Sequence, residues 1–600
     1  MRALRCSERS RTLLVLRAIL DEVERNPEAP GDLTSLNSAW VLLDRVQRSA
    51  PDVLDAVLAY PYVSGWAGHT LRRLRVRATE PSPLWAHLGH LNSVAAAAAL
   101  RAGLDVRLSV PARNGMVSLP TLGMAYVPDG AGAPATPWSL AEIRSSAGHT
   151  EISVGQAVVV LPDDPTEDVQ GWWGLRRLHI RTRPDQPALS LHLDDLDPYR
   201  GFSGPLPPDR IGSVEARRWQ YLLTEAWSIV CIHLPEQARA LGAALDALVP
   251  LPPLGRFLVS SASSGEAFGG VLMSLPRDPA ALAATLVHES QHILLGGLIH
   301  LVALHNNDPE PRFYAPWRDD PRPVAGIIQG IYAFFGVARF WRALAGSPDE
   351  RLRRTAAFEY IRWHGPTCRA LDVLLRDPAL TETGRRFFEG VGTQLLSWQD
   401  EPFPAEVTMA ATTVANDHET HWRSHYLRPD AALVERIART IRTDSEGFRE
   451  TLQSEGCPLA DTLLAERNVP WPRTRADLIR RSVEGGITDK DFGTLEAEAT
   501  PGDLALAAGR HADSQHAYRA ELAVSPDSAW TGFALAWASA QPGPGPTLLL
   551  RRPALVRAVH RMLRETGESP EPDALATWMA TRWPDLASVQ PCPRTAMAYR

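Results

Sequence analysis

The stretch PAALAATLVHESQHILLGGLIHLVAL, residues 279–304, decides how the rest of the chain is interpreted. It contains the spacing H-E-x-x-H, in which His288 and His292 stand four residues apart. On an α-helix such positions lie on one face, one turn apart, so the two imidazoles can bind one metal ion. Glu289 lies beside them, where its carboxylate can act on a metal-bound water. The stretch therefore predicts a metal-binding helix.

The surroundings of the motif favour this interpretation. Asp278 suits the N-cap of a helix and Pro279 suits its first position, so we expect the helix to begin there. The preceding residues 256–276, RFLVSSASSGEAFGGVLMSLP, predict two strands around a loop rich in glycine and serine. Two imidazoles and a carboxylate in an apolar segment are costly to bury without a partner. A metal ion would satisfy them, and a structural cluster of hydrogen bonds is the alternative.

The chain has no third metal ligand at the sequence positions where the common zinc peptidases supply one. The extended motif H-E-x-x-H-x-x-G-x-x-H needs a glycine and a histidine where this chain has Leu295 and Leu298. Another arrangement takes a glutamate from the next helix, but residues 324–344 contain no acidic residue. His300 lies two turns beyond His292, too far along the axis to share the ion easily, and is assigned to ordinary helix polarity.

A second group of candidate ligands follows in residues 410–429, AATTVANDHETHWRSHYLRP, which predict a helix. His418 and His421 share a face at a spacing of three, and His421 and His425 share one at a spacing of four. A solvated helix face is the alternative for each of them.

The composition excludes several classes of protein. The formal net charge is −7, so the chain lacks the basic balance typical of nucleic-acid binding. Its five cysteines form no CxxC pair, which argues against a cysteine metal site or a disulfide framework. The N-terminus is too charged for a signal peptide, and no run approaches the roughly 18 apolar residues of a membrane span. We expect a cytoplasmic protein that binds neither nucleic acid nor membrane.

The pattern of apolar residues predicts an α+β protein that is mostly α, with a zincin-like HExxH helix against a small sheet. In the C-terminal region, small and aromatic residues recur in a pattern typical of tetratricopeptide (TPR) helical hairpins. The predicted division is a helical region 1–105, a β-rich mixed region 106–255, a metal-binding catalytic domain 256–440 and a helical, TPR-like region 441–600.

The sequence resembles a known family at this point. The segments SLPRDPAALAATLVHESQHILLGGLIHLVAL and FYAPWRDDPRPVAGIIQGIYAFFGVARFWR are similar to bacterial HExxH-type proteins that modify ribosomally synthesised precursor peptides (RiPPs). These proteins are also described as 2-oxoglutarate-dependent HExxH-type peptide β-hydroxylases. The resemblance runs from about residue 40 to about residue 430, and the HExxH segment followed by APWRDDPRP is its most specific part.

The resemblance implies an oxygenase that uses Fe(II) and 2-oxoglutarate to hydroxylate the β-carbon of a side chain in a precursor peptide. An iron site of this kind keeps open positions beside three protein ligands. Two would be His288 and His292, and we assign the third to His418, with Asp417 as the carboxylate alternative. Glu289 would then orient a metal-bound water or a histidine rather than act as the base of hydrolysis.

The distal carboxylate of 2-oxoglutarate calls for an arginine, which can bind it through two parallel hydrogen bonds. Arg318 and Arg322 of the loop FYAPWRDDPRP are the leading candidates, followed by Arg423. The alternative for the first two is pairing with nearby acids such as Asp319 or Asp320. Trp317 would anchor the loop by packing. Two other functions stay open: a zinc metallopeptidase acting on a peptide, and a non-catalytic helical scaffold.

Overall fold

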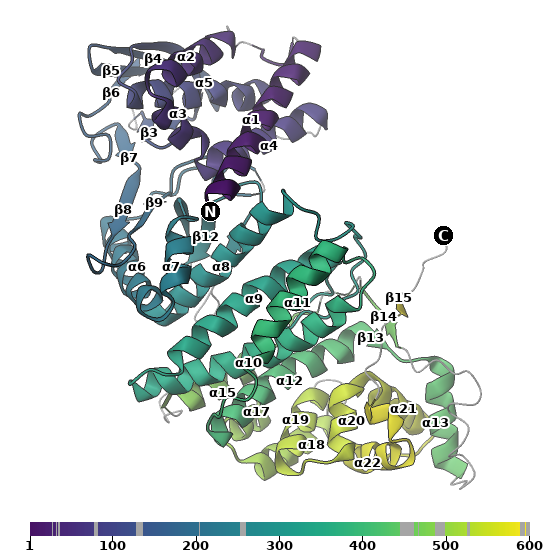
Figure 1. Ribbon diagram of the computed structural model, residues 1–600. Coiled ribbons are helices and arrows are strands. Elements are labelled where there is room, and N and C mark those ends of the chain that lie inside the picture. The colour runs from purple at the N-terminus through teal and green to yellow at the C-terminus, as the bar shows by residue number, and fades with distance from the viewer. Residues whose placement is uncertain are drawn as a thin grey trace. The chain divides into compact units, whose positions relative to one another are not determined.

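The chain forms two compact units, Met1–Val302 and Ala303–Arg600, in the computed structural model of the protein. The structure describes residues 1–26, 28–31, 33, 36–76, 82–127, 136–202, 204–252, 260–443, 461–465, 467, 469–485, 499–524, 529–588 and 594–595. The α+β class is confirmed, and helices predominate (Figure 1). The boundary between the units lies inside the range 256–440, so the four-part division stays a prediction.

The first unit begins with five helices, the last of which, α5, is long and apolar. Alanines 95–99 of α5 are completely buried, and their small side chains let the helix pack closely on strand β1. The five helices are α1 (Arg2–Arg25), α2 (Leu36–Ser49), α3 (Pro51–Leu58), α4 (Pro61–Arg75) and α5 (Leu84–Arg101).

An antiparallel sheet of seven strands follows, in the order β6-β5-β4-β1-β2-β3-β7. Inward positions of its strands alternate with outward ones, and the inward side chains share one hydrophobic core with the five helices. The strands are β1 (Val106–Arg113), β2 (Met116–Leu119), β3 (Gly123–Tyr126), β4 (Trp138–Ser146), β5 (His149–Val154), β6 (Ala157–Val160) and β7 (Trp172–Gly174).

A second sheet, in the order β11-β12-β10-β9-β8, carries the HExxH helix. Its inner strand β10 pairs in parallel with β12 and β9, and the edge strand β11 pairs antiparallel to β12. Helices α6, α7 and α8 pack together beside this sheet (Figure 1). The elements are β8 (Arg176–Ile180), β9 (Leu189–Leu193), α6 (Ser213–His233), α7 (Pro235–Gly242), β10 (Ala247–Leu251), β11 (Ser261–Ser263), β12 (Gly270–Ser274) and α8 (Pro279–Ile299).

The predicted start of the HExxH helix is confirmed. The Asp278 carboxylate accepts a hydrogen bond from the backbone N–H of Ala281 at 2.8 Å, and Pro279 is the first helical residue. Strand β12 is buried along its whole length, so the short connection from its end to Asp278 fixes where α8 starts.

The second unit is almost entirely helical. Its described strands form one small sheet, in the order β13-β14-β15. Its elements are α9 (Val324–Leu344), α10 (Glu350–Leu375), α11 (Glu382–Leu396), α12 (Ala405–Tyr426), β13 (Leu427–Arg428), α13 (Ala431–Thr443), β14 (Thr462–Leu463), α15 (Thr474–Gly485), α17 (Pro501–Ala507), α18 (His511–Val524), α19 (Trp530–Ala540), α20 (Pro544–Arg551), α21 (Pro553–Glu565), α22 (Pro572–Arg582), α23 (Asp585–Ser588) and β15 (Arg594–Thr595).

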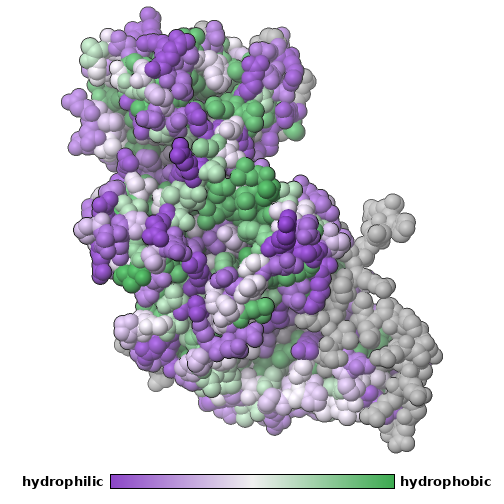
Figure 2. Space-filling view, viewed as in Figure 1, coloured by the Kyte–Doolittle hydropathy of each residue, from purple (hydrophilic) through white to green (hydrophobic). Residues whose placement is uncertain are grey.

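Among the described residues, α9 is the one helix long and apolar enough to cross a membrane by length and composition. It is 67% buried inside the protein over its most apolar window, and the core helix of a soluble protein passes the same test. Hydrophilic residues cover most of the visible face of the molecule, interrupted by smaller apolar patches (Figure 2).

Packing of aromatic rings explains why small residues recur in the C-terminal helices. The ring of Tyr518 in α18 lies against Gly502 of α17 and Gly532 of α19, where any Cβ would approach ring atoms within 2.6 Å. Consecutive helices of this region contact each other, as in helical hairpins. Its tetratricopeptide-like character stays a prediction, as does the zincin-like character of α8 and its sheet.

We expect Asp278→Ala to lower the free energy of unfolding by about 1 kcal/mol, because it removes the cap of α8. Asp278→Asn keeps an oxygen that accepts the same hydrogen bond and should stay within a few tenths of wild type. Urea denaturation followed by far-UV circular dichroism measures both. Equal destabilisation by the two substitutions would contradict a capping role.

Candidate metal centre

The two histidines of the HExxH motif face each other on α8. Their Nε2 atoms lie 3.1 Å apart, and the rings meet nearly edge to face, at 79°. Two nitrogens bound to one metal ion at about 2.1 Å are separated by about 3.0 to 3.4 Å in octahedral or tetrahedral geometry. Without a metal, the same two atoms form a hydrogen bond. His288 and His292 therefore already hold the separation that a shared ion requires.

The open side of α8 carries this pair. Thr285, His288 and His292 are half-buried, whereas Leu286 and Val287 between them are completely buried. The spacing of three and four places the three half-buried residues in one stripe along the helix. A catalytic metal must keep positions for a substrate, and this stripe is where solvent reaches the helix.

Burial keeps the first histidine uncharged. It lowers the pKa of His288 to about 3, and the nearby His292 lowers it further through charge repulsion. A neutral imidazole is the form that binds a metal, so no proton has to be removed from His288 near neutral pH.

Glu289 is held in place by a serine from the edge strand. Only 2% of Glu289 is exposed, and its Oε2 accepts a hydrogen bond from the Ser263 hydroxyl at 2.6 Å. Its other oxygen, Oε1, lies 4.0 Å from Nε2 of His288. One carboxylate oxygen is therefore fixed by β11 while the other lies beside the imidazole pair.

The neighbouring histidines do not extend this centre. His300 pairs with Glu8 at 2.7 Å, which agrees with ordinary helix polarity. Nδ1 of His305 accepts a hydrogen bond from the backbone N–H of Asn307 at 3.0 Å. Within the described ranges, no group of three or more His, Cys, Asp and Glu side chains is arranged to hold one ion.

The proposed third ligand, His418, belongs to the second unit. It is buried on α12, so it does not lie on a solvated helix face. Its Nδ1 lies 2.8 Å from the hydroxyl of Tyr314, and its Nε2 lies 3.7 Å from Oδ1 of Asp319. The indole of Trp471 meets the imidazole edge to face. Three side chains therefore fix the orientation of this ring.

Asp417, the carboxylate alternative, takes part in a buried ion network. It is 1% exposed and pairs with Arg475, which also binds Asp503 at 2.8 Å. Burial raises the pKa of Asp417, and Arg475 acts in the opposite direction. Asp417 already has a structural partner, whereas His418 on the same helix faces the loop that carries Asp319.

That loop is closed and anchored. Phe313 and Arg322 exchange two backbone hydrogen bonds, of 3.0 and 2.9 Å, so residues 313–322 form a compact turn. The predicted anchoring by Trp317 is confirmed: its indole stacks on Phe334 at 4.8 Å and lies over Gly330, where a Cβ would come within 2.2 Å of it.

The three candidate arginines are all paired. Arg318 and Arg322 each donate to Asp320 at 2.9 Å, one to each carboxylate oxygen. Burial acts to raise the pKa of Asp320, but the two arginines outweigh it and the pKa is lowered. Arg423 donates to Glu419 at 2.7 Å and to the carbonyl of Arg551 at 3.1 Å.

Asp320 thus pairs with both arginines, and Asp319 brings the formal charge of the turn 313–322 to zero. The pairing with Asp320 matches the alternative considered from the sequence. The side chain of Arg318 is 54% exposed, so part of its guanidinium group stays open to solvent. The guanidinium group of Arg423 is less accessible to a ligand than that of Arg318, because its side chain is largely buried against its partners.

No protein-family model matches this chain, and no curated protein matches it. The fold and site define an α+β protein whose first unit presents a histidine pair and a fixed carboxylate on one helix.

The roles of two residues of the site could not be predicted from the sequence. Ser263 is one of four serines in SSASS, and Tyr314 precedes the APWRDDPRP segment without a motif of its own. Both act through contacts over long sequence separations, 26 residues for Ser263 and 104 for Tyr314.

We expect Ser263→Ala to lower the free energy of unfolding by about 1 to 3 kcal/mol, because it leaves the buried Glu289 carboxylate without its hydroxyl donor. Ser261→Ala, on the same strand, is the matched control and should stay close to wild type. Urea denaturation compares the two. An equal effect at both positions would show that Ser263 does not hold Glu289.

Proposed function

We propose that the protein is an Fe(II)- and 2-oxoglutarate-dependent oxygenase that hydroxylates a side chain of a ribosomally synthesised peptide. The proposal of a metal site is supported by the two Nε2 atoms of His288 and His292, which lie 3.1 Å apart on the half-buried stripe of α8. The choice of iron and of a peptide rests on the resemblance of the HExxH and APWRDDPRP segments.

The donor set fits a non-haem iron. His288 and His292 offer two imidazole nitrogens, and the assignment of His418 as the third ligand rests on the resemblance alone. When bound, iron with 2-oxoglutarate and O₂ supplies the oxidation of an unactivated C–H bond. Glu289, fixed through Ser263, orients the histidine pair and offers one oxygen as a hydrogen-bond acceptor for a water beside it.

The loop 313–322 is suited to the carboxylates of 2-oxoglutarate. Arg318 and Arg322 both pair with Asp320, and the partly exposed guanidinium group of Arg318 keeps donors from which a ligand carboxylate can accept hydrogen bonds. The stacked Trp317 limits the movement of the loop, so the guanidinium groups keep their spacing when no ligand is bound. Arg423 is the third candidate for this role.

One observation favours the zinc metallopeptidase as the second candidate. Glu289 lies directly beside the histidine pair, where the general base of a zinc peptidase stands. The two functions differ in their products: oxidation adds an oxygen atom to the peptide and leaves it intact, whereas hydrolysis divides it.

One assay separates these functions from a non-catalytic scaffold. The apo-protein is reconstituted anaerobically with Fe(II), and candidate peptide, 2-oxoglutarate and O₂ are added. Succinate and a peptide heavier by one oxygen atom support the proposal. Cleavage fragments formed with Zn(II) would establish the peptidase, and neither product with the correct peptide would favour the scaffold.

We expect His288→Ala to abolish turnover and to weaken Fe(II) binding by more than about 100-fold, because residues that merely orient a ligand already contribute about 10- to 100-fold. His179→Ala, an exposed histidine on β8, is the control and should bind like wild type. Anaerobic equilibrium dialysis measures the metal. Wild-type binding by His288→Ala would contradict the metal site.

We expect Arg318→Ala to abolish turnover while leaving Fe(II) binding unchanged, since the arginine would hold the co-substrate and not the metal. Arg376→Ala is matched to it, because Arg376 is an exposed arginine paired with one aspartate. Succinate formation at increasing 2-oxoglutarate compares the variants. Full activity of Arg318→Ala would show that the co-substrate binds elsewhere.

A further inference from the structure

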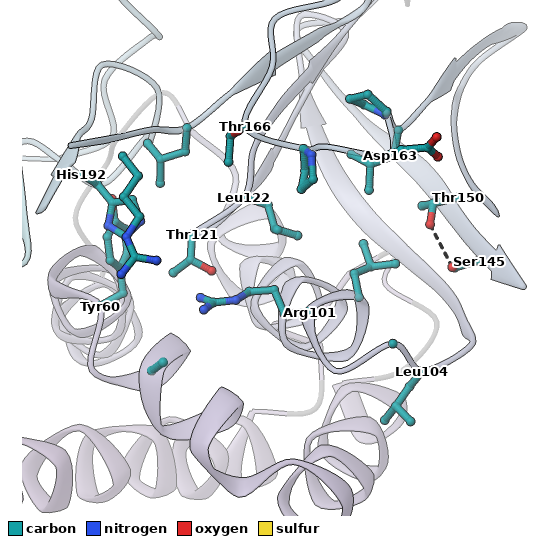
Figure 3. Close-up of a pocket in the computed structure, with 18 of the residues that line it drawn as sticks. Tyr60, Arg101, Leu104, Thr121, Leu122, Ser145, Thr150, Asp163, Thr166 and His192 are labelled. Atoms are coloured by element: carbon teal, nitrogen blue, oxygen red, sulfur yellow. Dashed lines mark hydrogen bonds between the residues drawn. The ribbon is translucent and has the colours of Figure 1, made fainter. Parts of the chain in front are cut away.

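A large cavity lies within the first unit, apart from the metal helix. Its volume is about 830 Å³, and its lining comes from α3, α5, the turn before β3, the segment after β6 and the strands β8 and β9. Figure 3 shows Arg101 extending from α5 into this space, toward Thr121 and His192. None of His288, Glu289 and His292 lines it.

The arginines of the cavity differ in their partners. Arg5 forms two hydrogen bonds of 3.0 Å with the carboxylate of Asp246, so its charge is neutralised. Arg177 bonds only to the uncharged hydroxyl of Ser190, at 3.2 and 3.3 Å. Arg101 has no hydrogen bond or ion pair with any described residue. Two positive charges therefore lack a carboxylate partner.

These two charges lie close enough to repel each other. Burial lowers the pKa of Arg101, and the charge of Arg177 lowers it further. Both guanidinium groups stay accessible to solvent, so a ligand can reach them. An anion between them would remove the repulsion and accept charge-assisted hydrogen bonds from both.

Neutral polar atoms complete this end of the cavity. His192 lies opposite Arg177 on the paired strands β8 and β9. Burial lowers its pKa to about 4, and Arg177 also lowers it, so the ring is uncharged near neutral pH. The ring of His192 interacts with the backbone of Asp246, whereas the buried Oγ1 of Thr121 has no hydrogen-bond partner among the described residues. An unpaired buried polar atom is costly, and a ligand would satisfy it.

The remaining wall of the cavity mixes polar residues with a group of aliphatic and proline side chains. The apolar group comprises Leu100, Leu104, Leu122, Leu161, Pro162 and Leu175. Two further carboxylates of the lining, Asp105 and Asp163, form no ion pair with Arg101 or Arg177 among the described residues. The cavity thus combines two arginines without a carboxylate partner with a group of leucines.

We propose that this cavity binds an organic carboxylate, with the carboxylate between Arg101 and Arg177 and an apolar body against the leucines. The carboxylate can belong to a free small molecule or to an acidic side chain of a peptide. The proposal is independent of the metal centre and of the oxygenase function.

Calorimetric titration of the full chain tests the proposal with three probes: hexanoate, its neutral counterpart hexanamide, and the blocked dipeptide Ac-Leu-Glu-NH2. We expect hexanoate to bind roughly 10- to 100-fold more tightly than hexanamide, because only the carboxylate accepts charge-assisted hydrogen bonds. Tighter binding of the dipeptide than of hexanoate would assign the site to a peptide, and weaker binding would assign it to a free acid. Equal affinities for hexanoate and hexanamide, or no binding of either, would overturn the proposal.

A charge-removing variant locates the site. Arg101→Gln should weaken hexanoate binding roughly 10- to 100-fold and leave hexanamide binding unchanged. The substitution breaks no described contact, so folding should be unaffected, which circular dichroism checks. Arg48→Gln removes the same charge from an exposed arginine of α2 outside the cavity. Equal hexanoate affinities of the Arg101 and Arg48 variants would overturn the assignment.

Discussion

The arrangement of α8 depends on one constraint: the helix buries most of its side chains and leaves His288 and His292 half-buried on one stripe. Burial keeps the first imidazole neutral, and the spacing of four residues brings the two Nε2 atoms to 3.1 Å. Glu289, next along the chain, points into the protein and is fixed by Ser263. Asp278 sets where the helix starts, and the buried side chains of α8 set which of its residues face outward.

In the second unit, too, local contacts hold the polar side chains of the candidate site in place. The turn 313–322 is closed by backbone hydrogen bonds and anchored by Trp317, and it brings Asp319 to His418 and Asp320 to two arginines. A rigid turn that already holds its arginines in place lowers the entropic cost of binding an anion. In the buried network of Asp417, by contrast, Arg475 is shared by two carboxylates.

Local signals in the sequence predicted the helix start, the α+β class and the packing role of Trp317, because capping, periodicity and bulky aromatics act over a few residues. Pairing of the loop arginines with Asp320 was considered from the sequence, because these residues are neighbours in the chain. The partners of Glu289 and His418 were not predictable. Ser263 and Tyr314 reach their partners through the fold, and nothing in their neighbourhood marks them. The cavity around Arg101 was missed for the same reason: its lining comes from elements that are far apart in the chain, from Arg5 of α1 to Asp246 before β10. The third metal ligand stays a prediction, since no described group of three ligands contains it.

X-ray absorption spectroscopy of the Fe(II)-reconstituted full chain tests the central claim most directly, because it reports the atoms bound to the metal. The account predicts light N and O ligands at about 2.1 Å together with the outer-shell scattering of at least two imidazoles. The imidazole signal should fall in His292→Ala. A metal surrounded only by oxygen ligands, with no imidazole contribution and no change in His292→Ala, would contradict the assignment of α8 as the metal-binding helix.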